Sequence, residues 1–323
     1  MQADYDPPFL FRSAHLSTIL PNRLRKVEGV KYSPLTIETS DSDFIDLDIS
    51  RVGSKICVLL LHGLEGSSHS TYILGMVKRI NEHGLDAVAM NHRSCSGRQN
   101  DLPSSYHSGK SDDVLFVINK LNKTYQAIHL VGFSLGGNIA LKLAGELKVS
   151  FNTRLKSVSA ISVPCDLAAC AAQMNKASNK IYLQRFLNQL KTKITGKAKK
   201  FPFAKIDLEK VLAASTFEEF DDAYTAPFHG FKSAMDYYEK SSSKKFISEI
   251  RIPTLIINAQ NDPFLPENCF VDVVEENPSI QLLTPKYGGH VGFAADFRMR
   301  KPFWHERKVV DFIMSIRYVQ ADS

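Results

Sequence analysis

One serine lies between two glycines in the stretch Gly132-Phe133-Ser134-Leu135-Gly136, and its hydroxyl is a candidate nucleophile. The stretch follows an apolar run at residues 128–131 and precedes a segment with helical periodicity, residues 138–147. The pattern is typical of a nucleophile elbow, in which serine lies on a sharp strand-to-helix turn and glycines let the two elements approach closely. The start of the helix would stabilise the negative charge that develops during acyl transfer. A plain glycine-rich turn is the alternative, and the flanking strand and helix favour the elbow.

Two further side chains must assist such a serine, because a hydroxyl is a weak nucleophile at neutral pH. A histidine takes the hydroxyl proton, and a carboxylate orients the histidine. Behind an elbow serine, the acid and then the histidine follow in chain order. Asp262 fits the acid, because it lies in a turn with Asn and Pro after an expected strand at residues 254–258. His290 fits the base, because it lies among glycines after an expected strand at residues 280–283.

Other residues compete for these two roles. Asp166 follows an expected strand that ends at residue 163, a place where some enzymes of this chemistry carry the acid. Of the ten histidines, only His290 and His305 follow Asp262 in the chain. His305 begins the charged final helix and is expected on the surface. Chain order and position therefore favour Asp262 and His290.

The negative oxygen of an acyl-transfer intermediate needs two backbone N–H donors, one after the nucleophile and one in a loop after an earlier strand. Leu135 follows Ser134 and is the first donor. The strand expected at residues 56–61 leads into His62-Gly63-Leu64-Glu65-Gly66, which makes Leu64 the second candidate. A plain turn is the alternative for this loop. Cys95 lies in another loop after a strand, has no evident base, and is expected to form pocket wall.

Short β-type segments alternate with helical ones, which predicts an α/β fold with a mostly parallel sheet and helices on both faces. We expect strands at residues 45–52, 56–61, 86–90, 128–131, 158–163, 254–258 and 280–283. We expect helices at residues 72–82, 112–122, 138–147 and 306–316. The first strand alternates apolar and polar residues, as an edge or antiparallel strand does, whereas residues 58–61 are continuously apolar, as in a buried parallel strand. The sheet is therefore expected to be mixed.

The alternation stops after Pro164 and resumes at Pro253, and the interval between them is helical and polar. We expect helices there at residues 182–190, 206–214 and 233–238. The sequence thus predicts one domain, residues 1–323, in which residues 166–250 form an inserted helical lid over the strand ends. A helical subdomain that only packs is the alternative. Its aromatic residues favour an apolar acyl site or a packed core equally: Phe186, Phe201, Phe203, Phe217 and Phe220.

Composition excludes several functions. The net charge of +6 is spread along the chain except for six lysines, and no nucleic-acid-binding motif is present. We expect these lysines to form a solvated surface, with contact to anionic lipid or an acidic substrate as the alternative: Lys191, Lys193, Lys197, Lys199, Lys200 and Lys205. The sequence contains no H-E-x-x-H, Walker A or G-x-G-x-x-G pattern, so neither a metal nor a nucleotide cofactor is expected.

The cellular setting follows from the cysteines and the apolar runs. Five cysteines, an odd number, lie far apart without a C-x-x-C pair, which predicts reduced thiols and a cytoplasmic location. The first ten residues, MQADYDPPFL, lack the positive charge and long apolar run of a secretory signal. No run of about 18 apolar residues occurs, so we expect no integral membrane segment.

With these residues in place, the chain resembles the α/β-hydrolase superfamily, and more narrowly its YheT-like branch of esterases, over almost its whole length. The marks of the branch are Pro8-Phe9-Leu10, His15-Leu16-Ser17-Thr18-Ile19, His62-Gly63-Leu64-Glu65-Gly66-Ser67 and Tyr106-His107-Ser108-Gly109. The resemblance implies carboxylester hydrolysis without a cofactor. It also implies a triad of Ser134, Asp262 and His290 and an oxyanion hole made by Leu64 and Leu135.

Two features depart from the family pattern. Animal relatives carry a membrane anchor and are linked to lipid substrates, whereas this chain shows no such anchor, so membrane residence is not carried over. The loop that usually reads Arg-Gly-Cys-Ser-Gly has Ser94 in place of the first glycine. This substitution puts the shape of the loop, and with it the shape of the pocket, in question.

The hypothesis that follows is a serine esterase that forms an acyl-enzyme and acts on a small-molecule ester, with lipid-like esters among the candidates. Two alternatives stay open. One is a catalytically silent hydrolase fold that only binds a ligand, and the other is an acyltransferase with the same triad. The sequence does not predict the oligomeric state.

Overall fold

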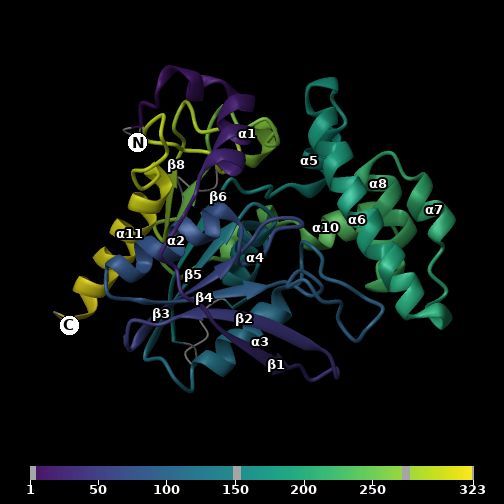
Figure 1. The fold of residues 1–323 in the computed structure, drawn as a ribbon, viewed down its shortest axis with the longest axis horizontal. Helices are drawn as coiled ribbons and strands as arrows, with labels where there is room; N and C mark the ends of the chain where they lie inside the picture. The colour runs from purple at the N-terminus through teal and green to yellow at the C-terminus, as the bar shows by residue number, and fades with distance from the viewer. Residues whose placement is uncertain (1–4, 148–153, 271–276, 322–323) are drawn as a thin grey trace.

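An eight-stranded sheet forms the centre of the computed structural model, which describes residues 5–147, 154–270 and 277–321 (Figure 1). Neighbouring strands follow the order β1-β2-β4-β3-β5-β6-β7-β8. β2 pairs antiparallel with β1 and β4, and the other pairs of described strands are parallel. The prediction of a mixed, mostly parallel sheet is confirmed. The bounds are β1 Ser33–Glu38, β2 Phe44–Ser50, β3 Ile56–Leu61, β4 Asp86–Asn91, β5 Ala127–Phe133, β6 Leu155–Ile161, β7 Thr254–Ile257 and β8 Ile280–Leu283.

A strand can be predicted from the sequence only where its burial requires a pattern of apolar residues. β3 is apolar and buried from its second residue onward, whereas β2 alternates between buried and half-buried residues. β1 was not expected, because its residues SPLTIE are almost all exposed. This strand lies at the edge of the sheet and pairs with β2 alone. An edge strand with no buried face carries no hydrophobic pattern to detect.

Helices cover both faces of the sheet, as predicted. Alternate residues of β3 point to opposite faces of the sheet. Leu59 and Leu61 pack in a core with α3 and α4 on one face, and Val58 and Leu60 pack in a core with α2 and α11 on the other. The two termini lie at the same side of the molecule (Figure 1). Helices outside the later insertion are α1 Ala14–Leu24, α2 Thr71–Glu82, α3 Ser111–Leu121, α4 Leu135–Leu147 and α11 Trp304–Ala321, with 3-10 turns η1 Phe9–Arg12 and η6 Glu267–Cys269.

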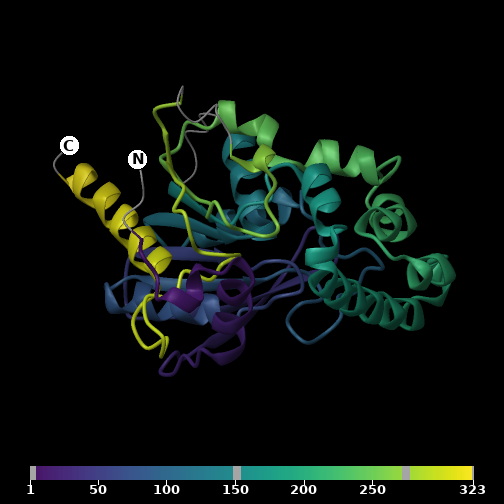
Figure 2. The same ribbon diagram turned by 90° about the horizontal axis from the view of Figure 1, so that it is seen from above.

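The segment between β6 and β7 is helical, and we name its residues 167–249 the helical insertion. It projects from the sheet on the side away from the two termini, in both views (Figures 1 and 2). The expected helix at residues 182–190 lies in the N-terminal half of a longer helix, α6, of 21 residues. The elements are α5 Leu167–Met174, η2 Ala177–Asn179, α6 Lys180–Lys200, η3 Pro202–Ala204, α7 Leu208–Ala213, α8 Phe217–Phe220, the π-helical turn η4 Asp221–Thr225, α9 Ala226–Phe228, α10 Ala234–Ser241 and η5 Ser243–Glu249.

The N-terminal helix α1, which was not expected, is fixed to the C-terminal helix α11 by a buried ion pair. Both guanidinium NH groups of Arg25, just after α1, donate to the carboxylate of Glu306, at N···O distances of 2.5 and 2.9 Å. Glu306 is fully buried, so this pairing is required to compensate its charge. The contact joins residues 281 positions apart, which sequence periodicity does not reveal.

Candidate active site

Ser134 lies on a sharp turn between β5 and α4, and its backbone is left-handed, with φ of 52°. A residue other than glycine adopts this conformation only at an energetic cost, which tight packing must maintain. A side-chain carbon on Gly132 would overlap the carbonyl group of Gly136, and one on Gly136 would overlap the carbonyl oxygens of Leu61 and His62. Glycine at both positions therefore allows strand and helix to approach. α4 begins at Leu135, three residues earlier than expected, which places Ser134 directly before the helix.

The structure brings Ser134, His290 and Asp262 together. The distance from His290 Nε2 to Ser134 Oγ is 2.9 Å, and the distance from His290 Nδ1 to Asp262 Oδ2 is 2.8 Å. A carboxylate only accepts hydrogen bonds, so in neutral His290 the proton lies on Nδ1 and Nε2 accepts from the serine hydroxyl. Asp262 is 4% exposed and His290 is 8% exposed. The order of groups along this chain of contacts is the order needed to remove a proton from Ser134.

Contacts from α1 and from the residue after β6 fix the loop that carries His290. The hydroxyl of Thr18 accepts the backbone N–H of His290 at 2.9 Å, and the hydroxyl of Ser17 donates to the Gly288 carbonyl at 2.7 Å. Ser162 accepts the next backbone N–H, that of Val291, at 2.9 Å. Sequence reasoning missed these residues as positioning groups. The available signal was that Ser17 and Thr18 lie in one of the motifs that carried the family resemblance.

Leu64 and Leu135 lie beside Ser134 in the lining of one pocket. Leu135 is the first residue of α4, where the backbone N–H has no partner within the helix. The N–H of Leu64 donates no hydrogen bond to another part of the described chain. Both amides are therefore available to a ligand in this pocket.

The loop around Leu64 is fixed by buried aromatic and histidine side chains. The N–H of Gly63 donates to the hydroxyl of Tyr72 at 3.0 Å, and the N–H of Glu65 donates to the hydroxyl of Tyr106 at 2.8 Å. His62 Nε2 accepts the N–H of His92, so Nδ1 carries the proton and donates to the Gly63 carbonyl. Burial, and next the neighbouring His92, holds the pKa of His62 well below its ordinary value. A neutral ring with one fixed tautomer thus supports the loop.

The competing acid and base lie elsewhere. Asp166 accepts the N–H of Ala169 at the start of α5 and pairs with Lys244, and it makes no contact with His290. The prediction that His305 lies on the surface is wrong, because its ring is fully buried against Phe133 and Phe293. Burial lowers the pKa of His305 to about 3. The start of the final helix packs on the sheet. The charged residues around it in the sequence give no sign of this burial.

The Cys95 loop keeps its shape despite the serine that replaces glycine. Ser94 has φ of 64°, the left-handed conformation that glycine favours, and its N–H donates to the side chain of Asn100. Cys95 itself does not line the Ser134 pocket and instead lines a neighbouring surface hollow, so the expectation that it forms pocket wall is wrong. Burial raises the pKa of its thiol to about 11, which keeps it protonated.

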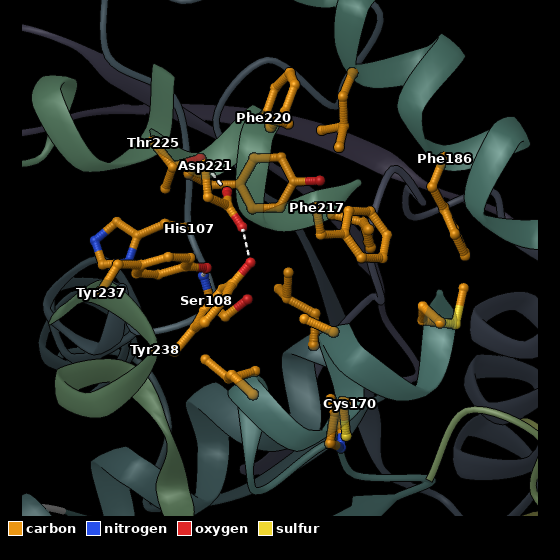
Figure 3. A pocket seen from close by; sticks show the side chains of 18 of the residues that line it. His107, Ser108, Cys170, Phe186, Phe217, Phe220, Asp221, Thr225, Tyr237 and Tyr238 are labelled. Atoms are coloured by element: carbon orange, nitrogen blue, oxygen red, sulfur yellow. Dashed lines mark hydrogen bonds between the residues drawn. The ribbon is translucent and has the colours of Figure 1, made fainter. Parts of the chain in front are cut away.

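The pocket at Ser134 has a volume of about 150 Å³ and lies between the sheet and the helical insertion (Figure 3). Of the five expected phenylalanines, Phe186, Phe217 and Phe220 line it, whereas Phe203 is 94% exposed. The three lining rings also pack in the core of the insertion, so they serve both expected roles. The other apolar and aromatic lining residues from the insertion are Leu167, Cys170, Ala171, Met174, Leu190, Ile194, Tyr224, Tyr237 and Tyr238.

Two lysines of the expected solvated cluster are buried, which corrects that expectation. Lys193 donates to the carboxylate of Glu65 at 2.6 Å, and these side chains are 11% and 7% exposed. Lys197 is fully buried and donates to the Leu102 carbonyl, and burial lowers its pKa to about 8. α6 therefore uses its lysines to fasten the insertion to the main body of the fold.

Replacing Lys193 with methionine should lower the free energy of unfolding by about 3–5 kcal/mol, because it leaves the carboxylate of Glu65 buried without a counter-ion. Lys199 lies exposed on the same helix, and Lys199→Met should change stability by less than about 0.5 kcal/mol. Urea unfolding followed by circular dichroism measures both. The double variant Glu65→Gln with Lys193→Met should recover much of the loss. An equal cost for the two lysine variants would contradict this interpretation.

Neither a metal site nor a membrane-spanning helix is found in residues 5–147, 154–270 and 277–321. No group of three or more His, Cys, Asp or Glu side chains there is arranged to hold a metal ion. No helix in the same residues is both long and apolar enough to cross a membrane.

Comparison with known proteins agrees with the fold. The family model described as alpha/beta hydrolase fold matches residues 56–296, most of the chain. The chain therefore belongs to the α/β-hydrolase family. Within this family it falls in the YheT-like branch. It is 32% identical to the YheT protein of Escherichia coli, an esterase by assignment, over 99% of this chain and 95% of that protein.

Two further curated relatives and one solved structure extend the comparison. Phospholipase ABHD3 of Homo sapiens is 27% identical over 93% of this chain and 76% of its own length. A monoacylglycerol lipase of Saccharomyces cerevisiae is 28% identical over 80% of this chain and 59% of its own length. The esterase Pf2001 of Pyrococcus furiosus superposes with a TM-score of 0.59 at 16% identity, covering 90% of this chain and 98% of that one. At that identity the superposition shows the shared fold alone.

Proposed function

We propose that this chain is a serine hydrolase that cleaves carboxylic esters, with Ser134 as nucleophile, His290 as base and Asp262 as the acid that orients His290. The observation that carries the proposal is the pair of contacts through His290, 2.9 Å to Ser134 Oγ and 2.8 Å to Asp262 Oδ2. The names of its relatives, which are an assigned esterase, a phospholipase and a monoacylglycerol lipase, support ester hydrolysis.

The proposed reaction has two halves. Ser134 Oγ attacks the ester carbonyl carbon while its proton moves to His290 Nε2, and the negative oxygen that forms accepts the N–H groups of Leu64 and Leu135. The bond to the alcohol then breaks as His290 returns the proton to the departing oxygen. In the second half, water loses a proton to His290 and attacks the acyl-enzyme, which releases the acid and restores Ser134. Asp262 stabilises the imidazolium of His290 in both halves.

The insertion is proposed to act as the lid predicted at residues 166–250 within a single domain. Its side chains form most of the apolar pocket lining, so closure over a substrate would exclude water from the acyl-enzyme until hydrolysis. An apolar pocket favours a small-molecule ester with a hydrocarbon part, including lipid-like esters. All five cysteines are free thiols, which supports the expected cytoplasmic location.

A fluorophosphonate probe tests the nucleophile directly, because it forms a covalent bond with an activated serine. We expect stoichiometric labelling of the wild type, none of Ser134→Ala, and full labelling of Ser248→Ala, in which an exposed serine is removed. A folded wild type that stays unlabelled would favour a catalytically silent binding protein. Labelling of Ser134→Ala equal to the wild type would refute Ser134 as nucleophile.

Product analysis separates hydrolysis from acyl transfer, which uses the same acyl-enzyme. The wild type is incubated with an ester and a competing alcohol or amine, and the acid and the transfer product are quantified. Free acid as the main product supports hydrolysis. If the transfer product dominates even at a low concentration of the alcohol or amine, the result would refute hydrolysis as the main reaction and favour acyl transfer.

A further inference from the structure

A half-buried carboxylate, that of Asp221, lines the same pocket as Ser134 but lies outside the proposed triad. Asp221 begins the π-helical turn η4 of the insertion, and the triad residues come from the turns after β5, β7 and β8. It makes no hydrogen bond to Ser134, His290 or Asp262. The proposed ester cleavage thus leaves this group without a function.

Two hydroxyl groups orient the carboxylate of Asp221. Tyr238 donates to Oδ2 at 2.8 Å and Thr225 donates to Oδ1, as the dashed lines in Figure 3 show. Two ionised oxygens accept about four hydrogen bonds, so acceptor capacity remains toward the pocket. Among the described residues, no Lys, Arg or His nitrogen forms an ion pair with Asp221, and the charge that acts on its pKa is the like charge of Asp222.

Burial therefore acts on Asp221 without compensation by a cation, and it raises the pKa of this carboxyl group to about 7. A buried carboxylate without a counter-ion is unfavourable, and a cationic ligand would relieve that cost. His107 lines the same pocket but supplies no cation, because burial and next the neighbouring His229 hold its pKa well below its ordinary value. Lys193 also lines the pocket, and its charge is already paired with Glu65. Near neutral pH, a positive charge from outside the chain is what this part of the pocket lacks.

Aromatic rings surround the same carboxylate. Phe220, Tyr224, Tyr237 and Tyr238 all line the pocket, and Figure 3 shows Phe220, Tyr237 and Tyr238 beside Asp221. Ring centroids are 6.1 Å apart for Phe220 and Tyr224 and 5.2 Å apart for Tyr237 and Tyr238. Faces of aromatic rings attract cations, and rings combined with a carboxylate are the groups that recognise quaternary ammonium ions.

We propose that Asp221 and these four rings form a subsite for a positively charged ammonium group, carried by the ester substrate at a point remote from the cleaved bond. This assignment rests on the proposed esterase function. A metal cation suits the subsite poorly, because one carboxylate and ring faces provide too few oxygen ligands. A neutral hydroxyl would satisfy the spare acceptor capacity but not the charge or the rings, so the ammonium group is the better match.

Matched ester pairs test this subsite. Each pair shares a p-nitrophenyl leaving group and an acyl chain that ends in trimethylammonium in one ester and in the uncharged tert-butyl isostere in the other, over graded chain lengths. At the best chain length, we expect kcat/KM of the wild type to favour the charged ester by about tenfold. Asp221→Asn should remove that preference by slowing the charged ester alone. Glu239→Gln, at an exposed position of α10, should leave it unchanged.

The outcomes separate the two proposals. Turnover of neither ester would refute the esterase function. Equal turnover of both esters would refute the subsite alone, as would a charged preference that survives in Asp221→Asn. Faster turnover of an ω-hydroxy ester than of either member of the pair would show that the subsite binds a neutral hydrogen-bond donor and would refute the ammonium assignment. Should Asp221→Asn fail to fold, inhibition of the wild type decides: tetramethylammonium should inhibit more strongly than tert-butanol, and equal inhibition would overturn the subsite.

Discussion

His290→Ala is expected to lower kcat for a p-nitrophenyl ester by about 10⁶-fold, because loss of the base in a serine–histidine–acid triad removes nearly all of its activity. The ring of His290 contacts both Ser134 and Asp262, so no other described residue would replace it. Steady-state kinetics of the purified variant measure the effect. Circular dichroism on the same sample shows whether the fold is kept.

The matched control for this prediction is His69→Ala, which removes an exposed histidine. Its kcat should stay within about twofold of the wild type, since exposed positions away from the site have small effects. A folded His290→Ala variant that keeps more than a hundredth of the wild-type kcat would contradict the assignment of the base.

Asp262→Asn is expected to lower kcat by about 10⁴-fold with little change in fold, because an amide leaves His290 in the wrong tautomer. The amide can donate where the carboxylate only accepts, so His290 Nδ1 would accept and Nε2 would carry the proton. That proton would face Ser134 and prevent the ring from acting as a base. Kinetics across pH measure the loss.

Asp166→Asn is the control that separates the two candidate acids. Asp166 caps α5 through the N–H of Ala169, and asparagine caps helices equally well. Its kcat should therefore stay near the wild-type value. A large loss in Asp166→Asn together with a small loss in Asp262→Asn would reverse the assignment.

The sequence predicted the centre of the fold because a central strand, β3, is continuously apolar and is buried from its second residue onward. β3 and β8 have the expected bounds, and chain order together with position after a strand selected Asp262 and His290 from many acids and histidines. The fold class and the family are confirmed, whereas the roles of the three residues remain predictions. Their predicted proximity agrees with the distances between them.

What the sequence did not predict depends on contacts between distant segments. The sequence around Lys193 predicts a surface residue, but in the fold its ammonium group contacts Glu65, which is 128 positions away in the chain. His305 reads as exposed because charged residues surround it in the chain, yet the helix start docks on Phe133. β1 has no buried face, so no pattern of apolar residues marks it. In each case the local signal is polar, and tertiary packing decides the outcome.

Because α1 fixes the His290 loop, the proposed triad can be completed only late in the synthesis of the chain. Ser17 and Thr18 leave the ribosome early, and the residues they bind, Gly288 and His290, follow about 270 positions later. The Ser134 turn can form once β5, α4 and their neighbours are made, well before the base exists. A nascent chain would therefore carry its nucleophile without the group that activates it while residues 135–290 are made. Reactivity would appear only when α1 and the His290 loop meet, a late step because distant contacts form slowly.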